Sequence, residues 1–113
     1  MRSDRERLRD ILQAIKQIEQ YTVGGKLTFE QNKLIQSGVL YQIQIIGEAV
    51  RAMSADLREQ NPDVPWSAMV GMRNIVVHQY FEVDLNIAWL VVERDLSSLK
   101  GKIEAILQEL GET

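Results

Sequence analysis

Apolar residues recur every three or four positions along most of this 113-residue chain, and no stretch alternates convincingly with a period of two. The first apolar stripe consists of Leu8, Ile11, Leu12, Ile15 and Ile18. Before it, Ser3 and Glu6 have the spacing of a capping box, which predicts where this helix begins. The pair Gly24 and Gly25 is expected to end it. This pattern indicates helices and argues against sheets.

A second capping-box pattern, Thr28 to Gln31, precedes a longer apolar stripe and predicts a helix that continues to about Glu59. The stripe consists of Leu34, Ile35, Val39, Ile43, Ile46, Val50, Met53 and Leu57. Gly38 and Gly47 lie inside it, and each costs about 1 kcal/mol relative to alanine in a helix interior. They indicate either close packing against another helix or chain, or a kink, and the sequence leaves both open.

The segment from Gln60 to Val64 breaks this helix, and Pro65 suits the first position of a third one. We expect the third helix to fray near residues 78–81, and Asp84 to cap a last long helix. The apolar face of that last helix consists of Leu85, Trp89, Val92, Leu96, Leu99, Ile103, Ile106 and Leu110, with Gly111 past its end. The sequence therefore predicts one all-α domain over residues 1–113, an up-and-down bundle of about four main helices.

Composition argues against several classes of protein. Hydrophobic residues make up 45% of the chain and charged residues 26%, which is typical of a globular domain. With no cysteine and one histidine, neither a disulfide nor a protein-only zinc site is expected, and we expect no metal or cofactor. The polar N-terminal residues and the lack of a membrane-length apolar run predict a cytoplasmic protein that does not bind membranes. A net charge of −3 argues against broad nucleic-acid binding, so any RNA contact must be local or concentrated by a dimer.

The stretch from Pro65 to Phe81 contains the only histidine, His78, and no acidic residue. Arg73 precedes this histidine by five positions, and Tyr80 follows it by two. An arginine without a carboxylate in its own segment, next to a histidine and a tyrosine, suits an anionic group and above all phosphate. Taken singly, each residue also has a structural interpretation: a histidine at a helix end, a surface cation and a half-buried aromatic ring.

Helix geometry constrains this candidate phosphate site. Residues five apart on a helix point about 140° away from each other, so Arg73 and His78 do not share a face of an unbroken helix. Asn74 and His78 do share one. Arg73, Val77 and Tyr80 share another. Either the helix unwinds before His78, or a twofold axis brings two copies of the site together, and we favour the homodimer.

Residues 73–80, RNIVVHQY, fit the pattern R-x-x-x-x-H-x-Y with a polar residue after the arginine. Three further features accompany this pattern: I-G-E-A at residues 46–49, V-P-W at residues 64–66, and Asp84 with Trp89 in the last helix. Together they resemble the HEPN superfamily, and specifically the HepT-like toxins of prokaryotic HepT–MntA toxin–antitoxin pairs. The resemblance extends over nearly the whole chain.

The resemblance implies a metal-independent endoribonuclease that forms a homodimer with its two motifs facing each other. It implies that Arg73 and His78 are the catalytic pair and that Asn74 is a supporting polar group. It also implies a partner, an MntA-like nucleotidyltransferase antitoxin, which attaches AMP to Tyr80 and thereby silences the toxin. Glu48 matches a position of the family, but no firm role follows for it.

The implied chemistry is physically reasonable. A histidine titrates near neutral pH, so it can take the proton of an RNA 2′-hydroxyl or give one to the leaving oxygen. An arginine stabilises charge that gathers on the phosphoryl oxygens, and AMP on a nearby tyrosine blocks the site by its size and charge. The alternative function is a non-catalytic helical dimer that binds a nucleotidyltransferase partner or a nucleotide, which the acidic composition favours slightly. The sequence does not name the RNA target.

Overall fold

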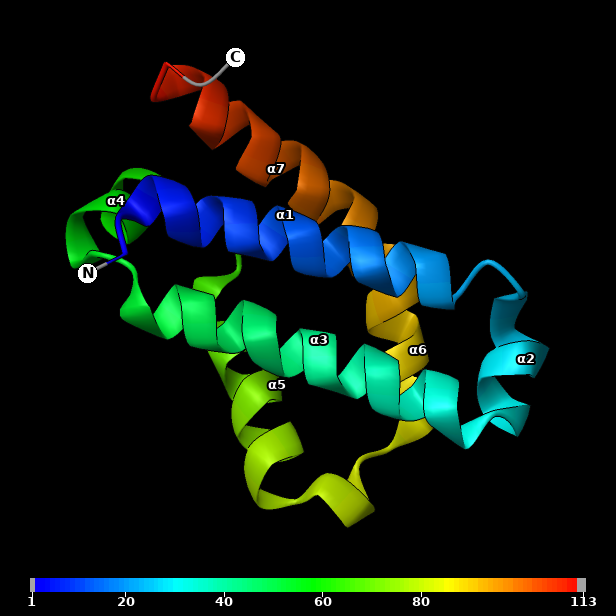
Figure 1. Ribbon diagram of the computed structural model, residues 1–113. Helices are drawn as coiled ribbons and strands as arrows, with labels where there is room; N and C mark the ends of the chain where they lie inside the picture. The colour runs from blue at the N-terminus through cyan, green and yellow to red at the C-terminus, as the bar shows by residue number, and fades with distance from the viewer. Residues whose placement is uncertain (1, 112–113) are drawn as a thin grey trace.

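The computed structural model describes residues 2–111, which form helices and connecting turns without any strand (Figure 1). The elements are α1 (Asp4–Tyr21), α2 (Gly25–Gln31), α3 (Lys33–Ala52), α4 (Ala55–Gln60), α5 (Trp66–His78), the 3₁₀ turn η1 (Tyr80–Glu82), α6 (Leu85–Leu90), the π-helical segment η2 (Val91–Asp95) and α7 (Leu96–Glu109). The fold is all-α, as predicted. The four main helices are α1, α3, α5 and the continuous run from α6 to α7. None of the described helices is long and apolar enough to cross a bilayer.

Helix α3 lies between α1 and α5, and α7 packs on α1 (Figure 1). Most of the predicted apolar stripes are buried in one core, whose completely enclosed side chains include Leu8, Ile11, Ile15, Ile18, Val39, Val50 and Ile103. The short helix α2 joins this core through Phe29, whose ring centroid lies 5.2 Å from that of Trp89. Burial of these side chains supplies most of the stability of the fold.

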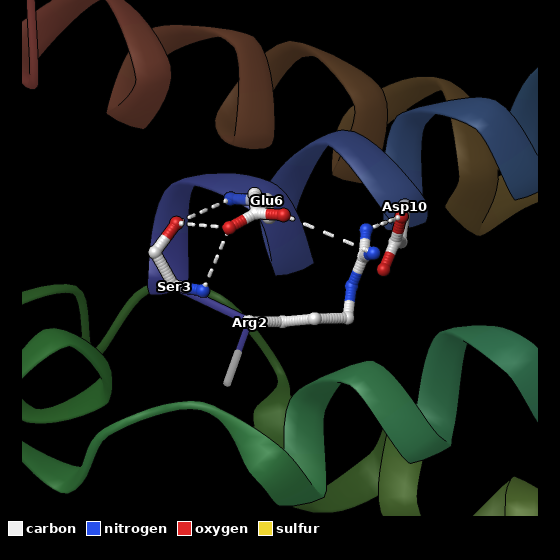
Figure 2. Close-up of polar contacts among 4 residues, drawn as sticks. All are labelled: Arg2, Ser3, Glu6 and Asp10. Carbon is white, nitrogen blue, oxygen red and sulfur yellow. Dashed lines mark hydrogen bonds and ion pairs between the residues drawn. The ribbon is translucent and has the colours of Figure 1, made fainter.

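The N-terminal capping box is present as predicted (Figure 2). The Ser3 hydroxyl oxygen accepts a hydrogen bond from the Glu6 backbone N–H, and the Glu6 carboxylate accepts one from the Ser3 N–H, both at 3.1 Å. The hydrogen bond from the Ser3 N–H has the largest effect on the pKa of Glu6 and lowers it below its ordinary value. The hydrogen bond with the Ser3 hydroxyl and the positive charge of Arg2 lower this pKa further. Arg2 also pairs with Asp10 at 2.6 Å. The helix ends at Tyr21, before the predicted glycine pair: the Thr22 hydroxyl donates to the Ile18 carbonyl at 2.8 Å, and Gly25, with φ 84°, is the first residue of α2. Local sequence therefore determines both ends of α1.

The second predicted capping box is wrong. Thr28 lies inside α2, where its hydroxyl donates to the carbonyl of Gly24. The residue that caps α3 is Asn32, whose side chain accepts from the Ile35 N–H at 3.1 Å. Burial of Phe29 keeps this segment in its own short helix, so the next helix begins four residues later than the pattern predicts.

The predicted continuation of the second helix to Glu59 is also wrong. Helix α3 ends at Ala52, because Met53 is extended, with φ −72° and ψ 154°. Ser54 then caps α4 by accepting a hydrogen bond from the Leu57 N–H. Met53 and Leu57 remain in the core, so the apolar pattern continues through a break in the helix.

Two apolar positions predicted to be buried are exposed. Leu34 is 82% exposed, because the register of α3 places it in line with Ser37 and Tyr41 on the outer side of the helix. Leu110 follows the last residue of α7 and is 36% exposed. Both lie at helix ends, where the apolar stripe extends beyond the buried surface.

Close packing accounts for both glycines of α3, which continues as one helix through them. A Cβ at Gly38 would lie 3.0 Å from the ring of Tyr21. A Cβ at Gly47 would lie 2.1 Å from the Cβ of Arg73 and 2.8 Å from the carbonyl oxygen of Met69. The second contact brings the backbone of α3 directly against α5.

The second half of the chain follows the prediction with small shifts. Pro65 is the N-cap of α5 instead of its first helical residue. The helix ends at His78, in the region expected to fray, and η1 follows it. Asp84 caps α6 with its side chain, and Gly111, with φ 85°, lies past the end of α7. The predicted last helix contains the π-helical segment η2, which the apolar pattern did not reveal.

Candidate active site between α3 and α5

Arg73 lies on the face of α5 that packs against α3, directly opposite Gly47. Because Gly47 has no side chain, the Arg73 Cβ fits against the backbone of α3. The Arg73 side chain is consequently only 16% exposed, which is low for an arginine in a small domain. This packing fixes the base of the side chain and leaves its guanidinium at the edge of the helix pair.

The Arg73 guanidinium has partners on both helices. Its Nη1 donates to the side-chain oxygen of Asn74 at 3.1 Å, and its Nη2 lies 3.7 Å from the carboxylate of Glu48. Glu48 in turn accepts a hydrogen bond from the side-chain amide of Gln44 at 3.0 Å. The Arg73 Nε is buried and has no hydrogen-bond partner. Arg73 therefore has a carboxylate partner. Its own segment contains no carboxylate, and α3 supplies one through Glu48.

His78 is the last residue of α5 and is exposed. The helix is unbroken from Arg73 to His78, so of the two alternatives that the sequence left open, unwinding before the histidine is excluded. The long Arg73 side chain nevertheless reaches Asn74, which shares a helix face with His78. Among residues 2–111, the His78 imidazole makes no hydrogen bond or ion pair. The guanidinium thus bonds Asn74 on the histidine face, and the described residues show no hydrogen bond between it and the imidazole.

Tyr80 lies in η1, where its hydroxyl forms a 2.8 Å hydrogen bond with the hydroxyl of Ser37 on α3. Its ring packs edge-on against Phe81, with centroids 5.4 Å apart, and Tyr80 is 39% exposed. Sequence reasoning did not find Ser37 or Gln44, and no motif marks either of them. Their helical spacing from Glu48 is the only signal that points to them.

Ser37, Tyr41, Gln44 and Glu48 recur at intervals of four, three and four, so they lie in one stripe along α3. The contacts with Arg73 and Tyr80 show that this stripe faces one side of α5 and η1. We call the polar members of this arrangement the α3–α5 seam: Ser37, Gln44, Glu48, Arg73, Asn74 and Tyr80. The seam links two of the predicted site residues, Arg73 and Tyr80, along a single edge of the protein.

A separate groove of about 370 Å³ opens on the other side of α5. It is lined mainly by apolar side chains, among them Ile43, Met69, Met72 and Leu99, and it contains neither Arg73 nor His78. Within the described part of the chain, no group of three or more histidine, aspartate or glutamate residues is arranged to hold a metal ion. The polar residues of the candidate site therefore lie at the seam and at the end of α5, outside this groove.

Comparison with known proteins identifies the family of this chain. The family described as "Ribonuclease HepT-like" matches residues 11–106. The chain belongs to the HepT-like ribonuclease family. A "Probable ribonuclease HepT" from Thermococcus cleftensis is 38% identical over 108 residues, covering 93% of this chain and 96% of that protein. A "Putative RNase" from Methanocaldococcus jannaschii is also 38% identical, over 88% of this chain and 92% of its own length. No solved structure gave a significant match.

Proposed function

We propose that this HepT-like protein is a metal-independent endoribonuclease in which Arg73 and His78 act on the same phosphate and Asn74 supports them. The observation that carries the proposal is the hydrogen bond from Arg73 to Asn74, which links the guanidinium to a residue on the helix face of His78. The ribonuclease family to which the chain belongs supports the substrate class.

In the proposed reaction, His78 takes the proton of a ribose 2′-hydroxyl, and the 2′-oxygen attacks the adjacent phosphorus. The bond from phosphorus to the 5′-oxygen of the next nucleotide breaks, and that oxygen receives a proton from an imidazolium. The products are a 2′,3′-cyclic phosphate and a 5′-hydroxyl. Arg73 stabilises the negative charge that gathers on the phosphoryl oxygens, and Glu48 and Asn74 hold its guanidinium in place.

The proposal includes a homodimer, because one chain does not join Arg73 and His78. A second copy against the outer face of α5 would bring its own pair to the same cleft. This face has room for a neighbour: a Cβ at Gly71 would meet no atom within 4 Å, and Ile75 beside it is 43% exposed. Two arginines in one cleft would also concentrate positive charge in a chain whose net charge is −3.

The proposal further includes regulation as a cytoplasmic toxin by a cognate MntA-like nucleotidyltransferase antitoxin. The Tyr80 oxygen would bond to the α-phosphorus of a nucleoside triphosphate, ATP, with loss of its proton and release of pyrophosphate. Tyr80 is exposed enough to be reached, and its hydroxyl lies at the surface beside Ser37. The added phosphate would repel the RNA backbone and compete for Arg73. An AMP-sized mass on the co-expressed protein that disappears in Tyr80→Phe tests this part.

Cleavage assays on purified variants test the catalytic roles. His78→Ala and Arg73→Ala should each abolish cleavage of single-stranded RNA, with helix content and oligomeric state unchanged. Arg94→Ala removes an exposed arginine of η2 outside the seam and serves as the control, which should cleave as wild type does. Cleavage by either motif variant at the wild-type rate would refute the mechanism. An inactive wild-type protein that still binds the nucleotidyltransferase would favour the non-catalytic alternative.

A further inference from the structure

Exposed aromatic rings gather along the α3–α5 seam. Phe81 is 99% exposed, Tyr41 is 57% exposed and Tyr80 is 39% exposed. Among residues 2–111 one further aromatic ring is exposed, that of Tyr21, which covers Gly38. Neither Tyr41 nor Phe81 packs in the core. Packing within the chain therefore gives no reason for these two large rings to lie at the surface.

The hydrogen bonds of the seam place these rings relative to Arg73. The Ser37–Tyr80 hydrogen bond ties Tyr80 of η1 to the first half of α3, and Phe81 follows Tyr80 with its ring edge-on to the tyrosine ring. The Glu48–Arg73 contact holds the guanidinium against the second half. Tyr41 is one turn from Ser37 and two turns from Glu48, about 10 Å along the helix axis. A cation and a set of rings therefore follow one line on the surface.

This combination suits a single-stranded nucleic acid. A guanidinium binds a phosphate, and every nucleobase has a flat face that stacks on an aromatic ring once the base is free of a duplex. Stacking does not depend on the net charge of the protein, so it suits a chain with a charge of −3. The polar groups between the rings, Ser37, Gln44 and the Glu48–Arg73 pair, favour a nucleic acid. A protein partner, which the exposed Leu34 in line with Tyr41 would also suit, is an outcome of the test below.

We propose that the α3–α5 seam is the binding track for single-stranded RNA, in which Tyr41 and Phe81 stack on bases that flank the phosphate held by Arg73. This inference rests on the proposed ribonuclease function and names the form of RNA that the site accepts. Few phosphates are contacted, so affinity should depend only weakly on salt. For one or two phosphate contacts the slope of log K against log salt is about −0.7 to −1.4.

The test uses the cleavage-inactive His78→Ala protein and fluorescein-labelled oligoadenylate, with binding followed by fluorescence anisotropy. Adding Tyr41→Ala or Phe81→Ala should weaken binding by about 5- to 150-fold, the range for loss of one stacked base. Tyr41→Phe keeps the ring and should bind as the parent protein does. Leu27→Ala, which removes a 71% exposed apolar side chain from α2, is the matched control and should also leave binding unchanged. The corresponding RNA duplex should bind more weakly than the single strand.

Several results would overturn the track. They are unchanged affinity in both alanine variants, no binding of the oligonucleotide by the His78→Ala protein, or equal loss of affinity in Tyr41→Phe and Tyr41→Ala. A change in sedimentation coefficient on Tyr41→Ala or Phe81→Ala would instead assign these rings to contact with a second copy or another protein. Failure of the catalytic proposal is distinguishable, because wild-type protein would then bind single strands through Tyr41 and leave them uncut.

Discussion

Replacement of Gly47 by alanine tests the close approach of α3 to α5. The new Cβ would lie 2.1 Å from the Cβ of Arg73 and 2.8 Å from the backbone oxygen of Met69. Neither atom is the end of a flexible side chain, so the helices must move apart. Two carbon atoms in contact are about 3.5–4.0 Å apart, which requires a shift of roughly 1.5 Å.

Overpacking of this kind costs about 1–3 kcal/mol, while alanine gains about 1 kcal/mol over glycine in helix propensity. Given the short distance to Arg73, we expect Gly47→Ala to lose about 1–2 kcal/mol of unfolding free energy. Gly101→Ala on α7 is the matched control, because a Cβ there meets nothing within 4 Å. It should gain about 0.5–1 kcal/mol.

Urea denaturation followed by far-UV circular dichroism measures both changes at one protein concentration. Gly47→Ala should also reduce RNA cleavage, because the shift displaces the base of Arg73. A Gly47→Ala protein as stable as the Gly101→Ala protein would refute the packing of α3 against α5 at this point.

Three further perturbations address separate features. Glu48→Gln removes the charge beside Arg73 and should slow RNA cleavage roughly 10- to 100-fold. Since this pair is partly exposed, it should change the unfolding free energy by less than about 1 kcal/mol. Gly71→Gln should keep its helix content but sediment as a monomer, and a dimer in that variant would exclude the outer face of α5 as the interface. The Ser3 hydrogen bonds lower the pKa of Glu6 in the folded protein below its ordinary value of 4.5. The contribution of Glu6 to the unfolding free energy is therefore complete above about pH 4.5 and is lost as the pH falls through the lower folded pKa. The stability difference between wild type and Glu6→Gln should therefore shrink in acid.

The helical class followed from the sequence because apolar periodicity and capping depend on residues only one or two turns apart. The Ser3 capping box and the Asp84 cap were predicted correctly for this reason. The sequence pattern placed a helix cap at Thr28, whereas the residue that caps α3 is Asn32, four positions later. The deciding factor was the contact of Phe29 with the distant Trp89, which no local pattern contains.

The candidate site was predicted only in part. The motif supplied Arg73, Asn74, His78 and Tyr80, but it gave no carboxylate partner for the arginine. Glu48 fulfils that role because Gly47 lets α3 approach α5 at that turn, and this register depends on packing across the whole helix pair. Ser37 was missed for the same reason. The catalytic roles of Arg73 and His78, the homodimer and AMP attachment to Tyr80 stay predictions.

Analysis of the RNA ends after cleavage tests the central claim most directly. Purified wild-type protein with excess EDTA should cut single-stranded RNA and leave 2′,3′-cyclic phosphate and 5′-hydroxyl ends, since the proposed steps use only the imidazole of His78 and the guanidinium of Arg73. His78→Ala, prepared identically, should leave the RNA intact. Products with 3′-hydroxyl and 5′-phosphate ends, or the same ends from the His78→Ala protein, would contradict the mechanism.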